Sequence, residues 1–164
     1  MKQRRYKSDY RLEDRTPVYQ GKWYIAPRRS ALPLGAITLM VWALAFLYLK
    51  TGAGTTRFMP ALLPALIALI PLFYQSMGVA ALARLPKRAT RGQVENSAGR
   101  TVRGALGACV FLLMGSVGCG IYCFINRAWS AEWYSCALLL AAGALNVWVF
   151  QKARGRYREI RAAE

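Results

Sequence analysis

Residues 104–126 read GALGACVFLLMGSVGCGIYCFIN, a run without a single Asp, Glu, Lys or Arg. A helix rises about 1.5 Å per residue, so a run of this length can cross the roughly 30 Å of hydrocarbon in a bilayer. A helix of a soluble domain would instead carry charged residues along one face. The run therefore predicts a helix that spans a membrane.

Three further charge-free runs accompany it, at residues 30–49, 58–83 and 133–151. Each is close to or longer than the roughly 20 residues that a spanning helix needs. We therefore expect an all-α membrane protein whose four transmembrane helices lie within residues 30–151, with a polar loop at 84–103. Composition alone would not decide this, because 55% hydrophobic residues also suits a soluble core.

The chain carries a formal net charge of +16, and its basic residues are unevenly distributed. Twenty of the 23 Lys and Arg residues lie before residue 30, within 84–103 or after residue 151, and three lie in the other two connections. Cytoplasmic segments are enriched in Lys and Arg, so this asymmetry predicts a cell-membrane protein with both termini and the long loop in the cytoplasm. Because the charge follows the topology, we expect it to contact anionic lipid headgroups and not nucleic acid.

Residues 1–29 form a basic arm that is rich in Tyr and Trp. Gln20 and Gly21 separate two β-prone runs, Pro17–Tyr19 and Lys22–Ile25, so a small hairpin is one interpretation. The interpretation that we favour is an arm lying along the headgroups, where aromatic residues are enriched. An isolated two-stranded hairpin is only marginally stable in water.

Thr90 and Gln93 match a capping box, in which each side chain bonds to a backbone N–H at the start of a helix. The third helix is therefore expected to begin near Arg91 and to extend about three turns beyond the membrane. Residues 152–164 alternate Arg with Ala, Tyr, Ile and Glu and are predicted to continue the fourth helix into a basic tail. The candidate contacts for anionic lipid or a partner protein are the cations of the long loop: Arg84, Lys87, Arg88, Arg91, Arg100 and Arg103.

Small residues are concentrated in the third span, and pairs four apart share a face on which another helix can approach closely. We expect the third and fourth spans to form the tightest helix contact, within the chain or between copies. A ligand groove on the same surface is the alternative. The candidate packing residues are Gly115, Ser116, Cys119 and Gly120 of the third span and Ala137 and Ala141 of the fourth.

Gln75 and Asn146 are the strongly polar residues inside the spans, and Pro71 lies at the centre of the second. Pro71 removes a backbone hydrogen bond and predicts a kink. We expect the two amides to hydrogen-bond neighbouring helices, since no ionisable residue that could support proton-coupled transport lies in a span. A role in binding a transported substrate is the alternative.

Cys123 and Cys136 each lie four residues from a charge at the same end of the spans, which makes them a candidate disulfide pair if that end is oxidising. Cys119 and Cys123 share a helix face, a spacing that could suit a soft metal such as copper(I). The chain has no His and no acidic residue within a span, so small apolar filling is the better interpretation of these thiols. We expect no metal and no cofactor.

The sequence offers little material for catalysis. It has no His, its acidic residues are scattered through polar segments, and it has no phosphate-binding loop or nucleophile elbow. We therefore expect no enzyme but a non-catalytic accessory or scaffold subunit, bound to another membrane or cytoplasmic protein or to itself. The alternative is a small transporter, channel or permease-like component acting as an oligomer, and a membrane enzyme ranks third.

Overall fold

The computed structural model describes residues 10–13, 16–19, 21, 23–25, 31–52, 54–127 and 132–162. Four long helices account for most of these residues: α1 (Leu32–Thr51), α2 (Met59–Ala83), α4 (Arg100–Asn126) and α5 (Trp133–Ala162). Each coincides with one of the predicted charge-free runs, which confirms the four helices. Helix α2 runs without interruption through Pro64 and Pro71.

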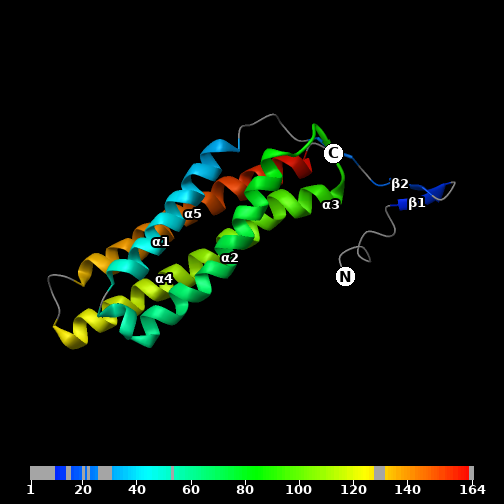
Figure 1. The fold of residues 1–164 in the computed structure, drawn as a ribbon. Coiled ribbons are helices and arrows are strands. Elements are labelled where there is room, and N and C mark those ends of the chain that lie inside the picture. The colour runs from blue at the N-terminus through cyan, green and yellow to red at the C-terminus, as the bar shows by residue number, and fades with distance from the viewer. Residues whose placement is uncertain are drawn as a thin grey trace.

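The four helices form an antiparallel bundle (Figure 1). Helix α2 packs on α4, α4 on α5, and α1 on both α5 and α2, so the bundle closes into a ring. We call one end the basic end, where α1 begins and α2 and α5 end. The opposite end, which holds the α1–α2 and α4–α5 connections, is the turn end.

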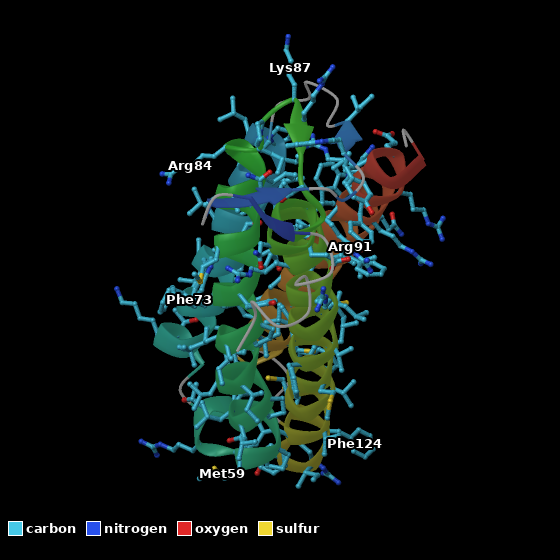
Figure 2. The ribbon with its side chains drawn as sticks, turned by 90° about the vertical axis from the view of Figure 1, so that its right-hand side faces the viewer. Met59, Phe73, Arg84, Lys87, Arg91 and Phe124 are labelled. Carbon is cyan, nitrogen blue, oxygen red and sulfur yellow. The ribbon has the colours of Figure 1, made fainter. Side chains whose placement is uncertain are left out.

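The outer surface of the bundle is apolar. Large hydrophobic side chains point away from the core, among them Ile70, which is 73% exposed, and Phe124, which is 76% exposed. Figure 2 shows Phe73 and Phe124 projecting from the bundle, with Met59 at the turn end and Lys87 at the basic end. An apolar surface of this extent marks a site of interaction with a membrane or another protein. All four helices are long and apolar enough to cross a membrane, as a multi-pass helical membrane protein requires.

The most extensive helix contact within the chain joins α2 and α4. A Cβ atom at Gly104 would lie 2.6 Å from the backbone nitrogen of Gln75, and one at Gly118 would lie 2.4 Å from the carbonyl oxygen of Pro60. Glycine therefore lets the two backbones touch near both ends of the contact. The prediction that the third and fourth spans make the tightest contact is wrong within the chain, and a contact between copies stays a prediction.

The rotation of α5 explains part of this difference. Ala137 and Ala141 are exposed, and the side of α5 that enters the core instead carries Leu138, Ala142 and Asn146. On α4, Gly115, Ser116 and Cys119 are buried as expected of a packing face, whereas no neighbouring atom lies within 4 Å of a Cβ built at Gly120. Three of the four small residues proposed on α4 therefore face the core, but the two proposed on α5 do not.

The third helical segment begins with the predicted capping box. The Thr90 side chain accepts a hydrogen bond from the Gln93 backbone N–H, and the Gln93 side-chain oxygen accepts one from the Thr90 N–H. Helix α3 (Arg91–Val94) continues through a π-helical segment, Glu95–Gly99, directly into α4. The expected start at Arg91 is confirmed, and the π-helical segment was not predicted.

Two short strand pairs occur outside the four helices. Strand β1 (Tyr10–Glu13) pairs antiparallel with β2 (Thr16–Tyr19), and β3 (Tyr24–Ile25) pairs antiparallel with β4 (Arg88–Ala89). A hairpin that turns at Gln20 and Gly21 is therefore wrong. The run near Tyr24 instead pairs with the long loop, because this places the Tyr24 ring in an apolar cluster at the basic end.

That cluster is a small core outside the long bundle core. Its members come from three regions that are distant in sequence: β3, the stretch from the end of α2 to the π-helical segment, and the end of α5. The buried residues are Tyr24, Ala89, Val94, Ala98 and Ile160, with Leu82, Leu85 and Tyr157 packed against them. We call this the basic-end core. It fixes the long loop and the α5 extension to one another.

Candidate functional site at the basic end of the bundle

A buried polar layer crosses the bundle between its apolar clusters. The Gln75 side-chain nitrogen donates a hydrogen bond to the Thr38 hydroxyl at 3.0 Å, and the hydroxyl in turn donates to the Leu34 carbonyl oxygen at 2.7 Å. The Asn146 side-chain nitrogen donates to the Ala105 carbonyl oxygen at 2.8 Å. Both amides therefore hydrogen-bond a neighbouring helix, as expected from the sequence.

Each amide also keeps one oxygen atom without a partner. Gln75 and Asn146 are 0% exposed, and neither Gln75 Oε1 nor Asn146 Oδ1 accepts a hydrogen bond from any described residue. A buried oxygen without a donor costs free energy. The layer is thus a place where a small hydrogen-bond donor would be stabilised.

Glu95, the first residue of the π-helical segment, joins α5 to α4. Its Oε2 lies 2.6 Å from Nη2 of Arg103, and its Oε1 accepts a hydrogen bond from the Tyr157 hydroxyl at 2.5 Å. The carboxylate is largely covered, whereas the Arg103 side chain is 60% exposed. Arg103, predicted to contact anionic lipid, thus has a carboxylate of its own chain as a partner.

Arg100 lies one helical turn closer to the basic end. Its guanidinium carbon is 4.9 Å from the centroid of the Tyr74 ring on α2, a cation–π contact. The side chain is half-buried, and its Nε has no hydrogen-bond partner among the described residues. No carboxylate in the described ranges pairs with it. Two neighbouring arginines therefore differ: Glu95 neutralises Arg103, and Tyr74 only orients Arg100.

The remaining predicted cations surround the basic-end core. Arg84 follows the last residue of α2, and Arg84, Lys87, Arg88 and Arg91 are all exposed. Figure 2 shows Arg84 and Lys87 pointing away from the bundle at this end. Trp23 and Ile25, which flank Tyr24, are 51% and 56% exposed. The basic end thus combines exposed cations with exposed large apolar side chains.

Cys119, Cys123 and Cys136 lie toward the turn end, and all four cysteines of the chain are free thiols. The Cys136 sulfur lies 3.5 Å from the Ser116 hydroxyl oxygen and donates to the Ser116 carbonyl oxygen at 3.4 Å, in place of the candidate bridge to Cys123. Cys119 donates to the Tyr48 hydroxyl at 3.8 Å. Within the described segments, no three His, Cys, Asp or Glu residues are close enough to hold a metal ion.

Sequence reasoning missed the partners of the predicted residues. Thr38, Tyr74 and Tyr157 meet Gln75, Arg100 and Glu95 only through the packing of different helices. Glu95 and Arg103 are eight residues apart, a separation outside the i, i+3 and i, i+4 spacings of ordinary helix pairs. An aromatic residue near the membrane boundary was the one available signal for Tyr74.

Comparison with known proteins adds no relative: no protein-family model, curated protein or solved structure matches this chain.

Proposed function

We propose that the chain is a non-catalytic scaffold or accessory subunit of a cell-membrane complex, with its basic end in the cytoplasm. In this proposal the basic end binds a partner protein and contacts anionic headgroups. The asymmetric distribution of Lys and Arg supports the orientation. The same distribution attracts anionic lipid to that end.

The observation that carries the proposal is the basic-end core. Ordering each backbone residue costs about 1–2 kcal/mol, so a chain that needed only an anchor would gain little from fixing three distant regions into one surface. Tyr24, Ala89 and Ile160 are nevertheless buried together. Beside them lie exposed Trp23 and Arg88, and aromatic residues and Arg are enriched where proteins bind one another.

The bundle supports a structural role in a second way. The described spans contain no charged side chain at the level of the α2–α4 contact between Gly104 and Gly118, and backbone touches backbone at both of these glycines. Close contacts of this kind favour a rigid bundle.

A small transporter or channel component acting as an oligomer is the second candidate. The two buried amide oxygens of Gln75 and Asn146 favour it, because they could accept hydrogen bonds from a polar solute. Among the residues that the structure describes, no charged side chain accompanies them in the layer, so any such solute is expected to be neutral.

The test is purification of the tagged chain at its native expression level in a mild detergent. We expect a stoichiometric partner that is lost, by at least about tenfold, from the double variant Lys87→Glu, Arg88→Glu, since charge reversal at an interface costs several kcal/mol. Arg57→Glu, an exposed cation at the turn end, is the matched control and should keep the partner. A monodisperse chain without a partner that instead conducts a neutral solute in liposomes would overturn the proposal in favour of the second candidate.

A further inference from the structure

Arg100 lies near the depth at which lipid phosphates are found. Arg127 places the boundary of the hydrocarbon at the turn end near Asn126, the last residue of α4. Hydrocarbon of about 30 Å spans about 20 residues of this helix, from Asn126 to about Leu106. Arg100 follows about six residues, or about 9 Å, further toward the basic end, where its long side chain can reach the phosphates.

The surroundings of Arg100 leave its charge uncompensated by the described chain. The guanidinium carbon of Arg100 lies over the Tyr74 ring, and Glu95 is engaged with Arg103 and Tyr157. A half-buried cation is costly unless an anion accompanies it. The N–H groups of a guanidinium group match the oxygen atoms of a phosphate group.

We propose that Arg100, oriented by Tyr74, binds the phosphate of an anionic phospholipid between α2 and α4 at the basic end. The inference deepens the proposed lipid contact of that end, since it names one specific site within a generally basic surface. The exposed cations Arg84, Lys87 and Arg88 raise the local concentration of anionic lipid by long-range attraction, whereas Arg100 holds one lipid molecule by direct hydrogen bonds.

Native mass spectrometry of the purified chain, titrated with phosphatidylglycerol or phosphatidylcholine, tests the site. We expect one phosphatidylglycerol molecule to be retained in preference to phosphatidylcholine. Arg100→Gln should weaken that retention about tenfold or more, as expected for loss of charge-assisted hydrogen bonds. Tyr74→Leu should weaken it about two- to fivefold, through loss of the cation–π contact. Arg100→Lys, which keeps the charge but loses the planar edge, should fall between wild type and Arg100→Gln.

Arg154→Gln is the matched control. Arg154 also lies over an aromatic ring, that of Phe150 at 5.9 Å, but it is exposed on the α5 extension, so its loss should leave retention unchanged. Equal retention of phosphatidylglycerol by wild type and Arg100→Gln would overturn the specific site. The double variant Lys87→Gln, Arg88→Gln then tests separately whether the exposed cations of the basic end attract anionic lipid. Displacement of the lipid by millimolar inorganic phosphate would show that the site takes soluble phosphate and would overturn the lipid assignment. Should Arg100→Gln fail to fold, Arg100→Lys and Tyr74→Leu decide the question by the same criteria.

Discussion

At the residue scale, the glycines of α4 have different roles that only the structure separates. Gly118 faces the backbone of α2, where a Cβ atom would also lie 2.8 Å from Cα of Ala61. Gly120, two residues later, has open space beside it. Helix α4 is equally rich in small residues at both positions, so its composition does not distinguish a contact glycine from a tolerated one.

Gly118→Ala should therefore destabilise the protein, and Gly120→Ala should not. Backbone atoms cannot move aside as side chains can, so overpacking at Gly118 should lower the free energy of unfolding by about 1–3 kcal/mol. Gly120→Ala, the control on the same helix, should leave it unchanged or raise it by up to about 1 kcal/mol, because Ala favours the helix. Reversible unfolding in mixed micelles measures both. Equal stability of the two variants would contradict the α2–α4 contact described here.

Arg100 and Tyr74 show why a site can escape sequence reasoning. The position of Arg100 near a membrane boundary follows from the charge-free run beside it, and that much was predicted. Its contact with Tyr74 requires the register of α2 on α4, which the glycine contacts set. The identity of the cation could be predicted from the sequence, but its partner could not.

For single helices and strands, the sequence predicted the features that depend on residues close together in the chain. The capping box at Thr90 and Gln93 predicted the start of the third helix because the residues involved are adjacent in the chain. The π-helical segment and the pairing of β3 with β4 depend on tertiary contacts. The face that α5 turns to the core also depends on its neighbours, and Ala137 and Ala141 are exposed, away from the core, for that reason.

The cap itself is open to a direct test. Thr90→Ala removes the acceptor for the Gln93 N–H and should cost about 1 kcal/mol, which corresponds to about a fivefold loss of protection from hydrogen exchange at the first turn of α3. Exchange in the transmembrane part of α4 should stay unchanged, since the cap acts locally. Thr90→Ser keeps a hydroxyl at the same position and should restore protection. If Thr90→Ala exchanged like wild type, the cap would contribute nothing to the order of the long loop.

The four-helix architecture of the whole molecule follows most directly from the sequence. Four charge-free runs predicted four helices, because no lipid-exposed backbone group can stay without a hydrogen bond in hydrocarbon and a helix satisfies all of its own. Figure 1 shows these helices side by side, with the start of α1 and the end of α5 at the same end. The basic-end core could not be predicted, since its residues come from three distant regions of the sequence.

The arrangement of the two ends across a membrane is the central claim, and labelling of single introduced cysteines tests it most directly. Arg88→Cys and Arg158→Cys report on the basic end, and Arg57→Cys and Arg127→Cys on the turn end; all four native residues are exposed. The wild-type chain, whose own cysteines lie within the helices, serves as the blank. With a membrane-impermeant maleimide, we predict that the first pair reacts only in inside-out vesicles and the second only in right-side-out vesicles. Reaction of Arg88→Cys and Arg158→Cys from opposite sides would contradict the four-span arrangement.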